Sequence, residues 1–158
     1  MVLEVNTKAP EFEAQALVNG EEKKISLSDY LGKRVVLYFY PKDMTPGCTI
    51  QAENLRDHNK KFEENDFVIL GVSPDSIEKH NSFVGKKQLN FTLIADEEKT
   101  LANLYDVWGE KKFMGKVYDG IHRTTYILDV EGMITHVLDK PKVKLHSEEI
   151  FKLFKIKL

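Results

Sequence analysis

The fold is decided by one stretch, Val35-Val36-Leu37-Tyr38-Phe39-Tyr40-Pro41-Lys42-Asp43-Met44-Thr45-Pro46-Gly47-Cys48-Thr49. Its first six residues are apolar, and an unbroken apolar run of this kind predicts a strand covered on both faces, as in a parallel sheet. A tight loop follows, and then a helix, because Thr45 is a good N-cap and Pro46 suits the first helical position. The only cysteine of the chain, Cys48, lies in the first turn of that helix.

The helix that starts here has one apolar stripe, at positions that step alternately by four and by three residues. The members of the stripe are Cys48, Ala52, Leu55 and Phe62, with Asn59 as the exception. Cys48 therefore lies at the N-terminal end of the buried face. The run Phe67–Val72 is a second continuous apolar strand. Strand, helix and strand at this spacing predict a βαβ unit with parallel strands and a right-handed crossover.

The remaining elements are shorter. We expect an N-terminal hairpin around the turn signal Asn19-Gly20, and further elements at 28–32 (helical turn), 75–89 (helix), 91–95 (strand), 98–105 (helix), 124–128 and 133–138 (hairpin) and roughly 147–158 (helix). Residues 106–120 contain several glycines and are predicted to form a loop. There are no repeats or linkers, so we expect a single domain over residues 1–158.

Composition excludes several classes of function. The formal net charge of −2 gives no bulk attraction to nucleic acid or to an anionic membrane. No apolar run reaches membrane-spanning length, and Met1–Pro10 has no apolar signal-peptide core, so we expect a cytoplasmic protein. A single cysteine excludes an intrachain disulfide and a Cys-rich metal site. The five histidines lack the close spacing of helical metal sites, and no glycine-rich phosphate loop is present. We therefore expect neither a metal nor another cofactor.

Cys48 is the candidate reactive group. The thiolate, not the thiol, is the nucleophile, and the first turn of a helix favours an anion through its free N–H groups and the macrodipole. The residue also follows the carboxyl end of a central strand, where open α/β sheets place their ligands. A lone cytosolic cysteine is commonly a buried core residue, which is the alternative interpretation. Its position after Thr45-Pro46-Gly47 at a helix start favours the reactive one.

The pattern Pro41-x-x-x-Thr45-x-x-Cys48 resembles the active-site signature of the peroxiredoxins. The stretches 38–49 and 107–123 resemble the bacterioferritin comigratory protein branch, also called peroxiredoxin Q, and the similarity extends to Lys8–Phe12 and over nearly the whole chain. The resemblance implies an α/β, thioredoxin-like fold with a central mixed sheet flanked by helices. It also implies a thiol-dependent peroxidase that reduces hydrogen peroxide and organic hydroperoxides.

The resemblance also implies roles for individual residues. Cys48 matches the peroxidatic cysteine, which attacks a peroxide oxygen and becomes a sulfenic acid. Thr45 matches the hydroxyl that bonds the peroxide and the thiolate, and Arg123 the arginine that stabilises negative charge. Pro41 matches the proline that shields the pocket from water. Gly47 narrows the loop beside it, so that backbone N–H groups can converge on a small substrate.

The role that the resemblance implies for Arg123 can be checked against the predicted order and direction of the strands. It begins a strand, whereas Cys48 follows the end of one, so the two side chains meet only if the strand from Thr124 runs antiparallel to that from Val35. This requires a mixed sheet. Neighbours along a strand point to opposite faces, so if Arg123 is within the strand, His122 should point away from Cys48.

The sequence departs from the family at Glu53, where many members of this branch carry a resolving cysteine. With no second cysteine, the chain resembles a one-cysteine peroxiredoxin, and an external thiol must reduce the sulfenic acid: thioredoxin, glutaredoxin or glutathione. Helical residues five apart lie about 7.5 Å apart along the axis, so relatives with both cysteines must unwind this helix to join them. This chain need not do so. We expect a monomer.

Two other functions remain open on the residues alone. A cysteine hydrolase needs a histidine base beside Cys48, and the candidates are His58, further along the same helix, and His122. A non-enzymatic redox sensor could use the same sulfenic acid and pass the oxidation to a partner protein.

Overall fold

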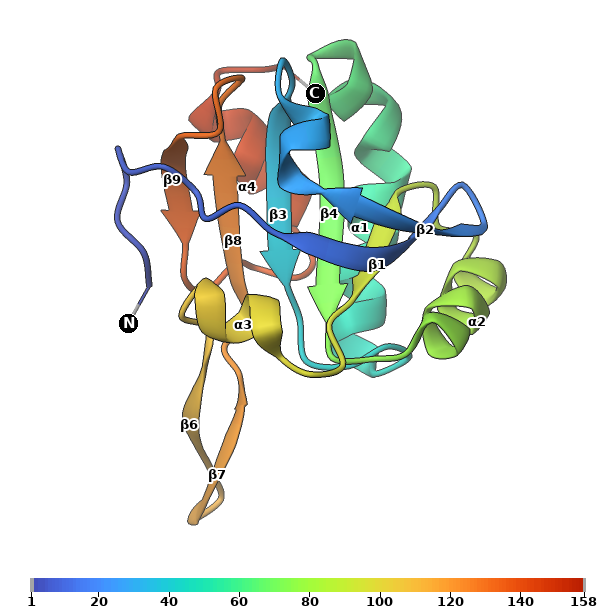
Figure 1. Cartoon of the computed structure of the whole chain (residues 1–158), viewed down its shortest axis with the longest axis vertical. Coiled ribbons are helices and arrows are strands. Elements are labelled where there is room, and N and C mark those ends of the chain that lie inside the picture. The colour runs from blue at the N-terminus through green and yellow to red at the C-terminus, as the bar shows by residue number, and fades with distance from the viewer. Residues whose placement is uncertain (1, 158) are drawn as a thin grey trace.

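The computed structural model describes residues 2–157. Its elements, shown in Figure 1, are β1 (Glu13–Val18), β2 (Glu21–Ser26), the 3-10 helix η1 (Leu27–Tyr30), β3 (Arg34–Phe39), α1 (Pro46–Glu64), β4 (Phe67–Ser73), α2 (Ile77–Lys87), β5 (Thr92–Ala95), α3 (Thr100–Leu104), β6 (Trp108–Phe113), β7 (Lys116–Ile121), β8 (Thr124–Leu128), β9 (Ile134–Leu138) and α4 (His146–Leu153). Seven strands form one sheet in the order β2-β1-β5-β4-β3-β8-β9.

The central strand β3 has a parallel neighbour on one side and an antiparallel one on the other. It pairs with β4 in parallel, which confirms the predicted βαβ unit, and with β8 antiparallel. The sheet is therefore mixed, as a thioredoxin-like fold requires. In the register of β3 with β8, Phe39 lies opposite Thr124. Arg123 is thus delivered to the end of β3 from which the chain leads to Cys48.

Both faces of β3 are buried, which explains its unbroken apolar run. Alternate side chains enter one cluster with the N-terminal segment and α3, namely Val35, Leu37 and Phe39. Those between them enter a second cluster with α1, α2 and α4, namely Val36, Tyr38 and Tyr40. Cys48 belongs to the second cluster. The stripe predicted for α1 is buried throughout, Asn59 included.

The N-terminal hairpin is confirmed, since β1 and β2 pair antiparallel around Asn19 and Gly20. Both turn residues have positive φ, 51° and 82°, as the tight hairpin turn requires. The predicted helices are also present but shorter, because each begins or ends inside the predicted range. The last predicted residue of the final helix, Leu158, lies outside the described residues.

The predicted loop over residues 106–120 is wrong. Most of it, with Ile121, forms the antiparallel hairpin β6–β7, which projects from the body of the molecule (Figure 1). Its strands touch the main body little, so side chains on both faces are exposed or half-buried, except that of Ile121 at the base of the hairpin, which is buried. The alternation that marks a half-buried strand is therefore absent from the sequence. Of the helices in residues 2–157, none is long and apolar enough to cross a membrane.

Candidate active site

Cys48 lies in the first turn of α1, which begins at Pro46. The N–H groups of a first turn have no intrahelical acceptor, and the macrodipole is positive there, so an anion is favoured at this place. The residue is only 1% exposed. The helix that holds it is packed against the sheet by the apolar stripe predicted from the sequence.

Arg123 places its guanidinium beside the sulfur of Cys48. Its Nη2 donates to Cys48 Sγ at 3.3 Å, and its Nη1 donates to Gln51 Oε1 at 2.5 Å. Gly47 lies against the same guanidinium, since a Cβ built on this glycine would be 3.5 Å from Nη2. The structure therefore brings together three of the predicted site residues, Cys48, Arg123 and Gly47.

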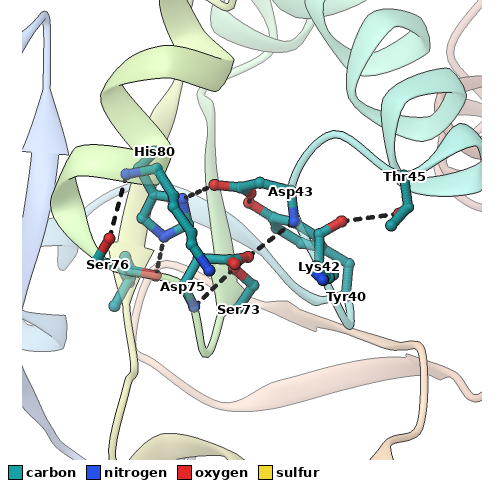
Figure 2. A network of polar contacts seen from close by, with 10 residues as sticks. Tyr40, Lys42, Asp43, Thr45, Ser73, Asp75, Ser76 and His80 are labelled. Carbon is teal, nitrogen blue, oxygen red and sulfur yellow. Dashed lines mark hydrogen bonds and ion pairs between the residues drawn. The ribbon is translucent and has the colours of Figure 1, made fainter.

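Thr45 occupies the N-cap position of α1 with an extended backbone, but its side chain makes no capping hydrogen bond. The prediction that Thr45 is the N-cap residue is therefore confirmed by position, although its hydroxyl does not cap the helix. The Oγ1 atom instead donates to the carbonyl of Lys42 at 2.8 Å (Figure 2). A hydroxyl that donates within its own loop keeps its lone pairs for another donor. Pro41 is half-buried, at the start of the same loop.

A buried polar network holds this loop against the sheet and α2 (Figure 2). Asp43 accepts a hydrogen bond from Tyr40 Oη at 2.6 Å, and its other carboxylate oxygen lies 2.6 Å from Nδ1 of His80. The backbone N–H of Asp43 donates to Asp75, which also accepts from the hydroxyl of Ser73. Each of these five side chains belongs to a buried residue. The loop before Cys48 is thus fixed from β4 and α2.

A second buried network holds Arg123. The amide Nε2 of Gln51 lies 3.2 Å from Nδ1 of His146, and Nε2 of that imidazole lies 2.9 Å from the hydroxyl of Thr125. His146 is the first residue of α4 and is fully buried. Burial, followed by the nearby charge of Arg123, lowers the pKa of His146 from 6.5 to about 3. The imidazole is therefore neutral at ordinary pH.

Lys111 adds a second positive charge near the thiol. Its Nζ donates to the carbonyl of Ile121 at 2.9 Å. The pKa of Lys111 is lowered, first by burial and then by the charge of Arg123, while the proximity of Cys48 acts in the opposite direction. Sequence reasoning missed this residue because β6 was predicted to be a loop.

The two histidines predicted as candidate bases, His58 and His122, have other partners than Cys48. Nδ1 of His58 lies 2.8 Å from the carbonyl of Asn54, and its ring packs against Phe151. His122 lies beside Gly109 and lines a surface hollow with Trp108 and Glu110. This placement argues against the cysteine hydrolase. In residues 2–157 no group of three His, Cys, Asp or Glu side chains could hold a metal ion.

A thioredoxin-like sheet that holds a lone thiol beside a guanidinium at a helix start defines a class of thiol-based redox proteins, and comparison with known proteins makes the class specific. The AhpC/TSA family model matches residues 5–137. Peroxiredoxin Bcp of Bacillus subtilis is 48% identical over 155 residues, covering 98% of this chain and 97% of that protein. Peroxiredoxin Bcp of Escherichia coli is 44% identical over 147 residues, covering 93% and 92%.

Solved structures agree with these relatives. Peroxiredoxin Q of Xanthomonas campestris superimposes with a TM-score of 0.84 at 33% identity, covering 91% of this chain and 89% of that one. A structure of the bacterioferritin comigratory protein of the same organism gives a TM-score of 0.86 at 30% identity, covering 96% and 98%. The chain therefore belongs to the AhpC/TSA family, in its Bcp or peroxiredoxin Q branch of thiol peroxidases. Its single cysteine is consistent with the one-cysteine type.

Proposed function

We propose that the protein reduces hydrogen peroxide and organic hydroperoxides through a sulfenic acid on Cys48, which an external thiol then reduces. The observation that carries the proposal is the 3.3 Å hydrogen bond from Arg123 Nη2 to Cys48 Sγ in a chain with no other cysteine. Organic hydroperoxides are included because the related Xanthomonas campestris structure is described in terms of alkyl peroxide reduction activity.

In the proposed first step, the Cys48 thiolate attacks one peroxide oxygen. A sulfur–oxygen bond forms, the oxygen–oxygen bond breaks, and the leaving oxygen takes a proton to become water or an alcohol. Arg123 stabilises the thiolate and the charge that develops on the oxygens. The hydroxyl of Thr45, with lone pairs to spare, accepts from the peroxide, and the first-turn N–H of Gly47 faces the substrate. Pro41 shields this pocket from water.

In the proposed second step, an external thiol attacks the sulfenic sulfur and releases water, which leaves a mixed disulfide on Cys48. A second thiol reduces the mixed disulfide and restores the Cys48 thiol, so each peroxide consumes two thiols and yields one disulfide. The thiol comes from thioredoxin, glutaredoxin or glutathione. The protein needs no partner subunit for this cycle, and we propose a monomer.

A steady-state peroxidase assay tests the proposal. Peroxide consumption is measured with thioredoxin and its reductase, and separately with glutathione and glutaredoxin, for the wild type and Cys48→Ser. Many turnovers with at least one reductant, abolished by Cys48→Ser, support the peroxidase. A single stoichiometric oxidation with every reductant would instead identify the redox sensor, and activity in Cys48→Ser would reject the role of this cysteine.

A further inference from the structure

The buried chain of hydrogen bonds behind Arg123 has only one consistent assignment of donors and acceptors. A guanidinium only donates, so the atom of Gln51 that faces Arg123 must be the amide oxygen. The other end of the amide is an NH₂ group, which only donates, so Nδ1 of His146 must accept from it. The single proton of the neutral ring is then on Nε2, which donates to Thr125 Oγ1 at 2.9 Å.

An acceptor behind Gln51 reinforces the orientation that Arg123 favours and holds the amide in place. Rotation of the amide by half a turn exchanges its oxygen and its NH₂ group, and the NH₂ group would then meet Nη1 of Arg123, donor against donor. An acceptor on the far side of the amide prevents this exchange. His146 is the group that supplies it, 3.2 Å from Gln51 Nε2.

The surroundings of His146 hold the ring in the required state. The imidazole is 0% exposed and packs edge-on against Tyr38, with ring centroids 5.8 Å apart. The first turn of α4 is attached to α1 next to it, because the N–H of Ser147 donates to Asn54 Oδ1 at 2.8 Å. A charged imidazole would present a second N–H to the NH₂ group of Gln51, and burial beside Arg123 disfavours that form.

We propose that His146 is a positioning residue for the peroxidase reaction: by accepting from Gln51 it fixes the amide oxygen toward Arg123, and so holds the guanidinium against Cys48. The proposal rests on the roles of Cys48 and Arg123 proposed above. It gives the C-terminal helix a function in the active site, which acts through Gln51 and Arg123.

The test compares three substitutions in α4. His146→Leu removes the acceptor at similar volume, His146→Gln restores one through its side-chain oxygen, and Phe151→Leu is the matched control. Phe151 is equally buried in α4 but packs on Phe62, with ring centroids 4.4 Å apart, outside the network. Two quantities are measured: the rate constant of Cys48 oxidation by hydrogen peroxide in a single turnover, and the pH profile of Cys48 alkylation by iodoacetamide.

His146→Leu should slow oxidation about tenfold, because it weakens the hydrogen bond between Gln51 and the charged guanidinium of Arg123. It should also move the alkylation profile to higher pH, while His146→Gln recovers most of both and Phe151→Leu changes neither. In an Arg123→Lys background, His146→Leu should have no further effect, because the two residues act in series. A wild-type rate and profile in His146→Leu, or equal losses in Phe151→Leu, would overturn the positioning role.

The design separates this proposal from the proposed function. If Arg123→Lys oxidises at the wild-type rate, the role of Arg123 fails and the positioning role fails with it. If Arg123→Lys is slow and His146→Leu is not, only the positioning role fails. Should His146→Leu not fold, nitrogen NMR of the wild type decides: a proton on Nε2 alone supports the assignment, and a proton on Nδ1 overturns it.

Discussion

Two fully buried histidines support the Cys48 region through different hydrogen-bond partners. His80, in α2, lies between the carboxylate of Asp43 at 2.6 Å and the carbonyl of Ile94 at 2.9 Å. A carbonyl only accepts, so Nε2 of His80 donates, and a second proton lies between Nδ1 and Asp43. His146 has an amide NH₂ group and a hydroxyl as partners, beside Arg123, and carries one proton.

The comparison shows that two equally buried histidines can serve different purposes, because their hydrogen-bond partners differ. His80 faces the carboxylate of Asp43, whereas His146 faces the NH₂ group of Gln51, and burial followed by the charge of Arg123 lowers the pKa of His146. In each case the hydrogen-bond partners of the histidine suit the part of the site that it supports. The His80–Asp43 pair fixes the loop before Cys48, and neutral His146 accepts from the amide that orients Arg123.

Asp43→Asn should destabilise the protein most. The substitution leaves the buried imidazole of His80 without its carboxylate, and breaking a buried pair costs about 3–5 kcal/mol of unfolding free energy. Urea denaturation followed by circular dichroism measures the loss. Asp57→Asn, on an exposed carboxylate of α1, is the control and should change little. A loss below about 1 kcal/mol in Asp43→Asn would show that the pair does not hold the loop.

His146 should make the protein less stable in acid. Its pKa is about 3 in the folded protein and 6.5 in the reference state, so below pH 6.5 the unfolded chain binds the proton first. Stability therefore falls as the pH drops from 6.5 toward 3, by about 2 kcal/mol at about pH 5. Unfolding free energies across this range should fall less steeply for His146→Gln. Equal slopes in the two proteins would contradict a neutral buried imidazole.

Thr125→Val should have a smaller effect. It removes the hydroxyl that accepts from His146 while keeping the shape, and an unsatisfied buried N–H costs about 1–3 kcal/mol. The ring is then less firmly held, so oxidation of Cys48 should also slow by a few-fold. Thr125→Ser keeps the hydroxyl and should oxidise at nearly the wild-type rate. Thermal unfolding and single-turnover oxidation check both variants, and a Thr125→Val protein identical to the wild type would remove Thr125 from the network.

The smallest effect should be the change in the hydrogen exchange of α1 when Cys48 is oxidised. Networks on both sides fix the start of the helix, and no second cysteine requires it to unwind. Hydrogen exchange of the amides from Cys48 to Asn59 should therefore be nearly unchanged after stoichiometric peroxide. A loss of protection there would show that the two networks open together when the sulfur is oxidised.

The apolar patterns of the sequence predicted the part of the fold that builds the site. The βαβ unit was identified from the continuous apolar runs of β3 and β4 and from the apolar stripe of α1. A strand buried on both faces is apolar throughout, and a helix buried on one face has a single apolar stripe. The requirement that Arg123 reach Cys48 then predicted the antiparallel pairing of β8. That pairing is present, with Phe39 opposite Thr124.

The polar networks could not be predicted in the same way. Asp43, His80 and His146 are single polar residues among many, and their partners come from distant segments that only the folded chain brings together. The Thr45 hydroxyl followed a local alternative, bonding Lys42 rather than capping α1. The hairpin β6–β7 was missed because it makes few contacts with the rest of the protein. Its sequence therefore lacks the alternation of apolar and polar residues that marks a strand with one buried face.

The most direct test of the account is the rate constant for oxidation of Cys48 by hydrogen peroxide, measured by stopped-flow fluorescence in the wild type, Arg123→Lys and His122→Ala. Arg123→Lys keeps the charge but loses the two-pronged contact with Cys48 and Gln51, and should be about a hundredfold slower. His122→Ala, one residue away and turned to the surface hollow, should match the wild type. An unchanged rate in Arg123→Lys, or an equal loss in His122→Ala, would contradict a thiolate activated by Arg123.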